Sequence, residues 1–430
     1  MNHPKSNTTK RSKLLYRTAF CWIVLIVLIA VLAPVIANDK PIMVIKNGTF
    51  HFPALSGNEQ IITKDESGNE IILDATDIHA LSEADAWYLM PPVQFFPNKS
   101  DIINSGYKSP GEIQLKKNPD GTYVTREGWE RHHLGTGKRG DDLLAGLIHG
   151  TRISITTGIF AMLVAGVIGI FLGAIAGYFG DTGLKAGRAT VICGLIGILP
   201  AWFYAFHLRI DILEKSIQVS PWSFWIQLLL SVIIFLLILV LFSLAGKLFR
   251  KFRIMNHRID IPADSMISRS IEIFTSIPSL ILIITLAAIS KPSLVNLIMI
   301  IGLTSWTEIA RLTRAEMLRM RKADFVEAAK GLAFTEWRIL FRHGLPNAIS
   351  PAMVAISFGI ASAILIESGL TFLGIGVPQN MATWGSLLFS GKENFSAWWL
   401  VVFPGIIIFL TVTSFNLIGE YLRDKWDPRS

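Results

Sequence analysis

Eight apolar runs, most of them long enough to cross a lipid bilayer, dominate this chain. Hydrophobic residues make up 51% of the 430 residues and charged residues 17%, and the mean hydropathy is +0.48. A helix needs about 20 apolar residues to span the hydrocarbon core. We therefore expect an all-α polytopic membrane protein with a small β-rich extracytoplasmic insert. The expected transmembrane helices are 20–36, 153–179, 190–206, 222–246, 273–289, 294–309, 352–373 and 398–417.

These runs divide the chain into regions. Pro278 and Pro404 are expected to kink or begin spans, and the run 294–309 is marginal in length, with Glu308 at its end. The expected regions are a cytoplasmic N-terminus (1–19), a first transmembrane helix (20–36), an extracytoplasmic insert (37–140), a second transmembrane helix (141–183), an insert with two transmembrane helices (184–263) and a core (264–430) with a cytoplasmic loop (311–351).

Lysine and arginine orient the expected spans, since positive charge near the ends of a span is retained in the cytoplasm. The first 17 residues hold five basic residues and no acid, and basic residues also gather in 247–258 and 311–342. With eight spans, both clusters and both termini are cytoplasmic, whereas 39–139 lies outside. The formal charge of +8 is therefore explained by basic residues at the cytoplasmic ends of the spans, where they contact membrane lipid. We expect no nucleic-acid partner.

Between the first two spans, short apolar stretches flank turn-forming residues in three places. Asn and Gly accept the positive φ that tight turns need, so these stretches predict β-hairpins. The pairs are 42–45 with 49–52, 61–63 with 70–73, and 112–115 with 122–125.

Other candidate residues predict no site. His132 and His133 are adjacent and lack further ligands at chelating spacing, so we assign no metal. Cys21 and Cys193 lie in separate apolar runs and indicate neither a disulfide nor a metal cluster. The run that contains Cys21 resembles a secretory signal, but its length favours an uncleaved anchor.

The basic stretch 311–351 holds a helix signal between two spans. Ala, Glu and Lys favour helix, and Asp324 and Glu327 complement the positive end of a helix dipole. Pro346 cannot continue a helix, because it lacks an N–H group. These residues leave two interpretations open: a rigid lever that another subunit pushes, and a basic helix resting on anionic lipid.

This stretch resembles the cytoplasmic coupling loop of permeases of binding-protein-dependent ABC importers. That family marks the loop with Glu-Ala-Ala, a later turn glycine and a closing Leu-Pro. The matching positions are Glu327, Ala328, Ala329, Leu345 and Pro346. The turn glycine is replaced by Ala333, so the bend is made by the earlier Gly331 or is less abrupt. The resemblance implies that Ala328 and Ala329 dock in an ATPase groove, with Glu327 at its rim.

The resemblance covers most of 134–180 and 271–429 and is to the dipeptide and oligopeptide permease family. The matching motifs are 133–136, 150–154, 176–180, 276–278, 310–316, 341–343, 371–377, 384–385, 403–405, 415–419 and 427–429. Segments 37–41, 50–53 and 91–97 are similar to the long-insert branch, which includes the microcin C type. The chain departs from the family at 135–137 and 140–142, and by inserting 184–263.

The resemblance implies the ABC importer permease fold, in a bacterial inner-membrane subunit that moves di- and oligopeptides by alternating access. Its partners would be a paralogous permease subunit, two cytoplasmic ATPase subunits that bind the ATP, and an extracytoplasmic solute-binding protein. No phosphate-binding loop, His-Glu-x-x-His or nucleophile elbow occurs in the sequence, so we expect no enzyme and no cofactor on this chain. A nickel chelate, glutathione or a peptide antibiotic as cargo stays open, and so does an ion-coupled secondary transporter.

Inside the spans, two features invite a functional interpretation. Gly169, Gly173 and Gly177 recur every four residues and form a smooth helix face, for packing within the chain or against another subunit. Glu367 lies in an apolar run, where an ionised carboxylate is costly, so it is a candidate for the transport pathway. Its place near the outer end of the run favours a hydrated or backbone-paired carboxylate instead.

Overall fold

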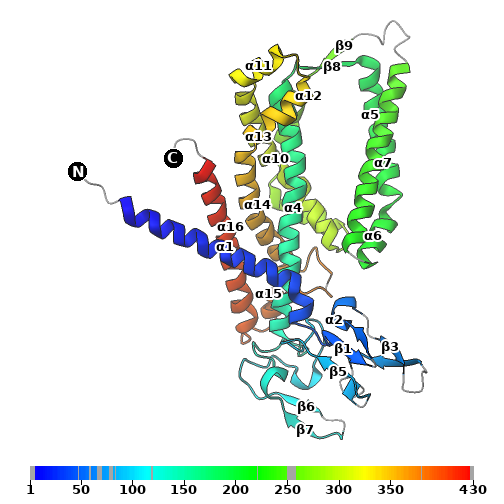
Figure 1. Cartoon of the computed structure of the whole chain (residues 1–430), viewed down its shortest axis with the longest axis vertical. Coiled ribbons are helices and arrows are strands. Elements are labelled where there is room, and N and C mark those ends of the chain that lie inside the picture. The colour runs from blue at the N-terminus through cyan, green and yellow to red at the C-terminus, as the bar shows by residue number, and fades with distance from the viewer. Residues whose placement is uncertain are drawn as a thin grey trace.

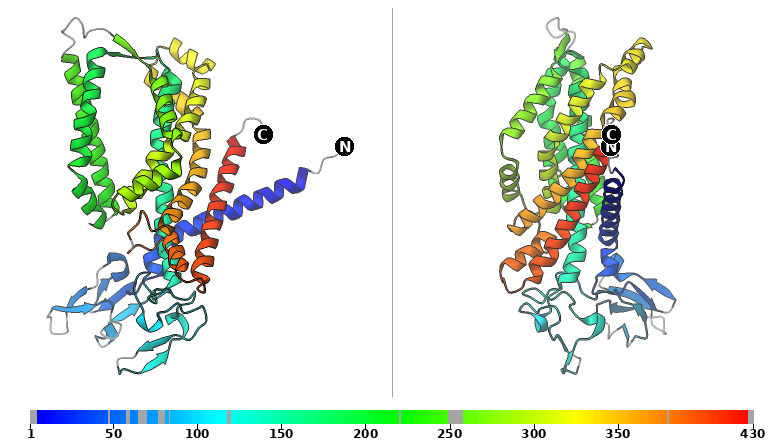
Figure 2. Two further views of the ribbon diagram at one scale, coloured as in Figure 1. Left: turned by 180° about the vertical axis from the view of Figure 1, so that it is seen from behind. Right: turned by 90° about the vertical axis from the view of Figure 1, so that its left-hand side faces the viewer.

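Long helices form most of the structure. The computed structural model describes residues 5–46, 48–57, 60–64, 70–76, 81–82, 84–117, 120–219, 221–248, 258–378 and 380–426. A bundle of helices occupies the centre, a β-rich segment lies at one end of it, and a helical hairpin stands beside it (Figure 1). Views from behind and from the side agree with this arrangement (Figure 2).

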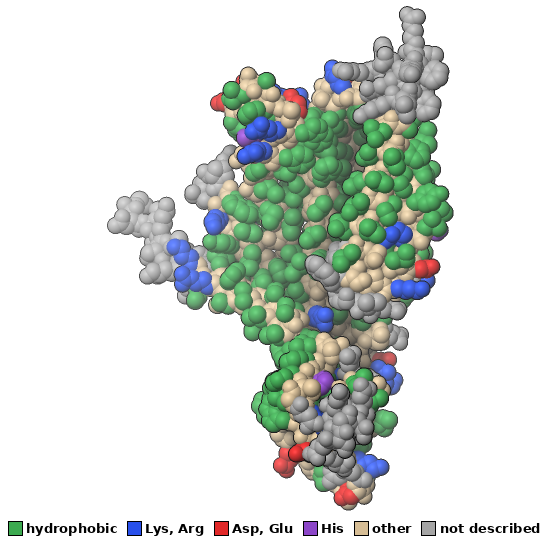
Figure 3. Space-filling view, turned by 45° about the vertical axis from the view of Figure 1, so that its right-hand side comes forward, with side chains coloured by type: hydrophobic (Ala, Val, Ile, Leu, Met, Phe, Trp, Pro, Cys, Tyr) green, Lys and Arg blue, Asp and Glu red, His purple; other side chains and the backbone are tan. Residues whose placement is uncertain are grey.

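Seven helices in the described part of the chain are long and apolar enough to cross a membrane, and the number is eight if a bent pair forms one more span. The expected fold class is therefore confirmed. On the face that Figure 3 shows, hydrophobic side chains are spread over the helices, as contact with lipid requires. The long helices are α1 (Lys5–Ile36), α4 (Leu143–Phe179), α5 (Arg188–Trp202), α7 (Pro221–Leu248), α10 (Leu294–Met320), α14 (Ser350–Phe372) and α16 (Trp399–Trp426).

The bent pair corrects one expected span. The helices α8 (Ala263–Ser276) and α9 (Ser279–Ile289) meet at an angle of 80°, so a continuous helix over 273–289 is wrong. The ring of Pro278 disfavours helical backbone in the preceding residue, and Ile277 is accordingly extended, with φ −97° and ψ 129°. Pro278 stands at the N-terminal boundary of α9, as expected of a residue that begins or kinks a span.

The helix α4 forms the centre of the bundle and packs along α10. A Cβ atom on Gly169, Gly173 or Gly177 would lie only 2.4–2.7 Å from a backbone oxygen of α10. The glycine face of α4 is therefore covered by α10 of the same chain. On other sides, α4 packs against α14 and α1, and α16 packs against α14 and α1.

The β-rich segment (residues 37–142) contains the three predicted hairpins as antiparallel pairs. Residues 47, 65–69, 118 and 119, which join these strands, lie outside the described residues. A strand that was not predicted, β5, adds to β1 and gives the order β2-β1-β5. The elements are β1 (Met43–Lys46), β2 (Thr49–His51), α2 (Pro53–Ser56), β3 (Gln60–Lys64), β4 (Glu70–Asp74), β5 (Trp87–Leu89), η1 (Ile102–Asn104), β6 (Leu115–Lys117), β7 (Tyr123–Thr125) and η2 (Gly128–Glu130).

The insert after α4 is a helical hairpin closed by a short β-ribbon. Strand β8 (Leu184–Gly187) pairs antiparallel with β9 (Arg258–Ile261), so both ends of the insert return to the same place. Between them, α5 continues through η3 (Phe203–His207) and α6 (Ile210–Val219), and α7 packs back on α5. This geometry agrees with an excursion out and back. Of the basic cluster in 247–258, residues 249–257 lie outside the described residues.

Candidate functional site

The α10–α14 segment (residues 321–349) lies at the end of the bundle opposite the β-rich segment (Figure 1). It folds into short helices instead of an extended loop. These are α11 (Asp324–Gly331), α12 (Glu336–Arg338), the π-helical turn η5 (Ile339–Gly344) and α13 (Leu345–Ala348). Pro346 lies in the first turn of α13, which follows η5 without a break in the helical backbone, so the expectation that Pro346 cannot continue a helix is wrong.

The helix α11 is amphipathic. Val326 and Ala329 are buried, 1% and 7% exposed, in a cluster with Met317 of α10 and with η5. Glu327 and Ala328 are exposed. Of the two alanines, Ala328 is on the free face of the helix, whereas Ala329 packs in the cluster that attaches α11 to the bundle.

The bend after α11 is made by Ala333. Its φ is +58°, a left-handed conformation that costs an L-residue about 1–2 kcal/mol. The Phe334 N–H donates to Ala329 O over 3.2 Å and the Ala333 N–H to Lys330 O over 2.9 Å. This pair of bonds is the Schellman C-cap, in which glycine is preferred at the position of Ala333. Gly331 belongs to α11 itself, so the alternative in which Gly331 makes the bend is excluded.

Two substitutions test this turn. We expect Ala333→Gly to stabilise the segment by roughly 0.5–1 kcal/mol, because glycine adopts positive φ without the steric cost that alanine meets. Gly331→Ala is the matched change and should be neutral or slightly stabilising, since a Cβ there meets no atom within 4 Å. Hydrogen exchange of the amides of 329–334 measures both. Slower exchange in Ala333→Gly is expected; faster exchange in that variant, or unfolding in Gly331→Ala, would contradict the assignment.

Three side chains tie this segment to α4. The Tyr178 hydroxyl, in the last turn of α4, donates to Glu336 over 2.5 Å. Lys330 Nζ lies 3.9 Å from the other carboxylate oxygen of Glu336 and 5.8 Å from the centroid of the Tyr178 ring. These contacts connect α11 and α12 with the last turn of α4. We call this group the Tyr178 latch (Tyr178, Lys330 and Glu336).

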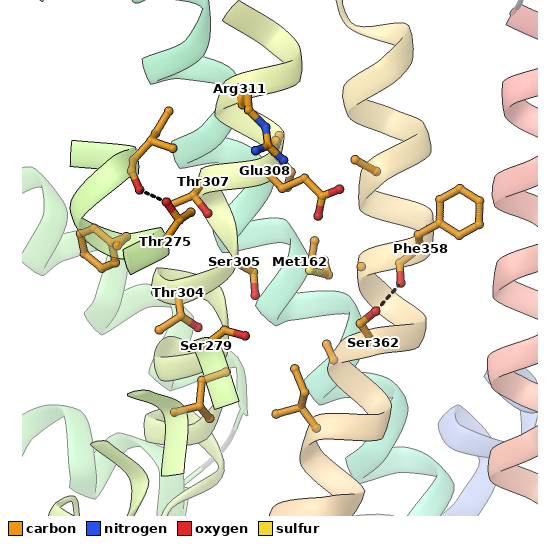
Figure 4. Close-up of a pocket in the computed structure, with 18 of the residues that line it drawn as sticks. Met162, Thr275, Ser279, Thr304, Ser305, Thr307, Glu308, Arg311, Phe358 and Ser362 are labelled. Carbon is orange, nitrogen blue, oxygen red and sulfur yellow. Dashed lines mark hydrogen bonds between the residues drawn. The ribbon is translucent and has the colours of Figure 1, made fainter. Parts of the chain in front are cut away.

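A cavity of about 460 Å³ lies between the α8/α9 bend, α10 and α14 (Figure 4). Its wall includes hydroxyl groups, one carboxylate and one guanidinium. They belong to Thr275, Ser279, Thr304, Ser305, Thr307, Ser362, Glu308 and Arg311. Thr275, Thr304 and Ser362 donate to carbonyl oxygens of their own helices, and their oxygen atoms keep lone pairs that can accept hydrogen bonds. Such a wall suits a polar solute.

Sequence reasoning did not single out Glu308 or Arg311 as lining residues. The run 294–309 was expected to end beside them, whereas α10 continues to Met320 and puts Glu308 near the middle of the helix. A signal was present, because Thr304, Glu308 and Arg311 recur at spacings of four and three, which marks one face of a helix.

Glu367, the carboxylate that the sequence indicated, does not line this cavity. Its side chain is fully buried between α14 and α4. It accepts hydrogen bonds from Ser154 of α4 at 2.7 Å, and from Ser368 and Thr371 at 3.3 Å. Side-chain hydroxyls thus take the place of the water or backbone partners that were expected. These hydrogen bonds hold α14 against α4 inside the bundle.

His132 connects the β-rich segment to the start of α4. Its ring nitrogens lie 2.9 Å from Asp142, the N-cap of α4, and 3.3 Å from Asp101. Arg126 pairs with Asp101 at 2.7 Å. Burial alone would lower the pKa of His132, but the hydrogen bonds with Asp101 and Asp142 outweigh it and raise this pKa. Burial would raise the pKa of Asp101, yet hydrogen bonds from His132 and Asn104, with the Arg126 charge, lower it to about 2.

These shifts predict a pH dependence for the β-rich segment. The His132 contribution is complete below the ordinary histidine pKa of about 6.5 and is lost as pH rises through the raised value. The Asp101 contribution is present above 3.8 and is lost as pH falls toward about 2. We expect hydrogen exchange of 101–135, corrected for its intrinsic rate, to accelerate at alkaline pH in the wild type. His132→Asn should remove this alkaline change; an identical profile in both proteins would contradict it.

Comparison with known proteins defines the class. Residues 255–429 match the family "Binding-protein-dependent transport system inner membrane component". A "Putative peptide transport system permease protein" of Brucella suis biovar 1 is 35% identical over 220 residues, which are 51% of this chain and 70% of the relative. The "Inner membrane ABC transporter permease protein YejE" of Escherichia coli K12 is 25% identical over 409 residues, 95% of this chain and 92% of the relative.

A "Putative peptide permease protein" of Brucella ovis is 39% identical over 173 residues, which are 39% of this chain and 57% of the relative. The chain thus spans just over half the length of that relative. The helical bundle, with its interior polar cavity, and these matches define a membrane transport component. The chain belongs to the family of binding-protein-dependent transport system inner membrane components.

Proposed function

We propose that this chain is an inner-membrane permease subunit of an ATP-binding-cassette importer for peptides. The observation that carries the proposal is α11, an exposed short helix inside the family match, with Glu327 and Ala328 on its free face. The names of the Brucella relatives support peptides as cargo. The polar cavity supports the same class, because hydroxyl groups can bond any peptide backbone without reading its side chains.

The proposed orientation has the α10–α14 segment and both termini in the cytoplasm and the β-rich segment outside. Arg319, Arg321, Lys322, Arg338 and Arg342 all lie near or in the α10–α14 segment, and positive charge is retained on the cytoplasmic side. The return of the insert to the β8/β9 ribbon at that end supports the even number of crossings that this orientation needs.

The proposed mechanism is alternating access driven by partner subunits. Two ATPase subunits bind ATP and engage Glu327 and Ala328, a paralogous permease subunit completes the pathway, and an extracytoplasmic solute-binding protein delivers the peptide. Movement of α11 pulls on α4 through the Tyr178 latch. The bundle then exposes the cavity to the other side of the membrane, and the chain itself catalyses no reaction.

Purification of the tagged chain, co-expressed with the transport genes beside its own, tests this assignment. We expect an ATPase and a second permease to co-purify in detergent and the assembly to hydrolyse ATP. A chain that purifies without an ATPase, and whose peptide uptake survives Glu327→Arg unchanged, would contradict the proposal.

A further inference from the structure

Glu308 stands where two cavities meet. The cavity at the α8/α9 bend shares Glu308, Ala355 and Phe358 with a second cavity of about 480 Å³. The second cavity lies between α10, α14 and α16, on the side of the α10–α14 segment. These three side chains therefore form the boundary between the two cavities.

Glu308 is the charged residue common to both walls. Arg311 lines the first cavity alone, and in the second Glu316 pairs with Arg319 at 2.8 Å. For Glu308, the described part of the chain contains no ion pair within 4.0 Å. Its side chain is exposed and reaches from α10 toward α14 (Figure 4), so packing does not account for it.

A carboxylate at this place favours solutes of one charge. An ionisable group that lies on a membrane helix and lines a cavity is by default a candidate for a solute pathway. A fixed carboxylate attracts cations and repels anions. Peptides offer such a cation in their α-ammonium group, and lysine- or arginine-containing peptides offer a second.

We propose that Glu308 is a specificity-determining residue of the pathway and binds a cationic group of the cargo, an ammonium or guanidinium, as the cargo moves between the two cavities. The hydroxyl groups of the first cavity hold the uncharged peptide backbone, and Glu308 adds the selection by charge. This inference rests on the proposed function, because it names the class of peptide that the permease favours.

The test is uptake by the complete reconstituted complex, with its own solute-binding protein and ATPases. Three forms of one lysine-containing peptide serve as cargo: unmodified, acetylated at the N-terminus, and acetylated at the lysine side chain. The readout is the uptake ratio of unmodified to acetylated peptide within one preparation. Poor assembly of a variant lowers the uptake of every peptide by the same factor and so leaves this ratio unchanged. The solute-binding protein is the same in every preparation, so its own preference contributes equally to every ratio.

We expect Glu308→Gln to lower this ratio by roughly tenfold, the factor that corresponds to about 1.4 kcal/mol. Glu308→Asp should retain most of the ratio, and Glu308→Asn, a second neutral variant, should repeat the loss. Glu272→Gln is the matched control, since Glu272 is exposed on α8, pairs with Arg269 at 2.7 Å and lines neither cavity. A fall in the ratio against the N-terminally acetylated peptide identifies the α-ammonium as the bound cation. A fall in the ratio against the peptide acetylated at its side chain identifies the lysine.

Equal ratios in the wild type, Glu308→Gln and Glu308→Asn would overturn this role of Glu308 while leaving a peptide permease in place. A wild-type complex that takes up none of the three peptides would instead contradict the proposed function, and the role of Glu308 with it. The two failures are therefore distinguishable in one set of measurements.

Discussion

Charge reversal at Glu327 is expected to reduce ATP-driven uptake by roughly tenfold or more while leaving the chain folded. The Glu327 side chain is exposed on the free face of α11 and is absent from the buried cluster that attaches this helix. If a partner offers a complementary positive charge, Glu327→Arg places like charges together in an interface, which costs several kcal/mol. Uptake of labelled peptide and ATP hydrolysis, measured on the same complex, report the loss of coupling.

Asp324→Arg is the matched control for that experiment. Both acids lie in the first turn of α11, so both substitutions remove the same favourable charge at the helix N-terminus, worth about 0.3–1 kcal/mol. A larger loss in Glu327→Arg therefore isolates the docking contact from helix stability. Equal uptake in Glu327→Arg and the wild type would remove Glu327 from the coupling surface.

The second large effect is expected at Gly173, where α4 packs tightly against α10. A Cβ atom there would lie 2.4 Å from Ala310 O and 2.9 Å from the Thr313 Cβ. Neither atom belongs to the end of a flexible side chain, so the two helices must separate. We expect Gly173→Val to destabilise the chain by about 3 kcal/mol, at the upper end of overpacking costs, and to lower its thermal unfolding temperature in detergent.

Gly369→Val controls for the insertion of a β-branched residue into a membrane helix. Gly369 is exposed on α14, and a Cβ there meets no atom within 4 Å. Its unfolding temperature should stay near that of the wild type. Similar losses in both variants would mean that the valine itself, and not the contact between α4 and α10, weakens the fold.

The fold was largely predictable because its causes are local. A run of about 20 apolar residues has to become a buried or lipid-facing helix, since its backbone finds hydrogen-bond partners only within itself. The hairpins of the β-rich segment follow from turn residues for similar reasons. The 80° bend between α8 and α9 was not predictable in size, because Pro278 breaks the helix while packing against α10 sets the direction.

The candidate site was only partly predictable, because burial depends on neighbours that are distant in the sequence. Glu367 and Glu308 both lie in apolar surroundings, yet Ser154 of α4 holds the first in a buried contact, whereas the second lines a cavity. The spacing of Thr304, Glu308 and Arg311 marks one face of a helix, but it does not say whether that face lines a cavity or packs against another helix. The left-handed turn at Ala333 shows the same limit, since alanine gives no local sign of a positive φ.

The most direct measurement is peptide uptake into proteoliposomes that contain the complete complex, with ATP and an ion gradient varied separately. We expect uptake to require ATP on the side of the α10–α14 segment and solute-binding protein on the side of the β-rich segment, and to be unchanged when the gradient is collapsed. Uptake that proceeds without ATP and stops when the gradient is collapsed would contradict the account and identify an ion-coupled carrier.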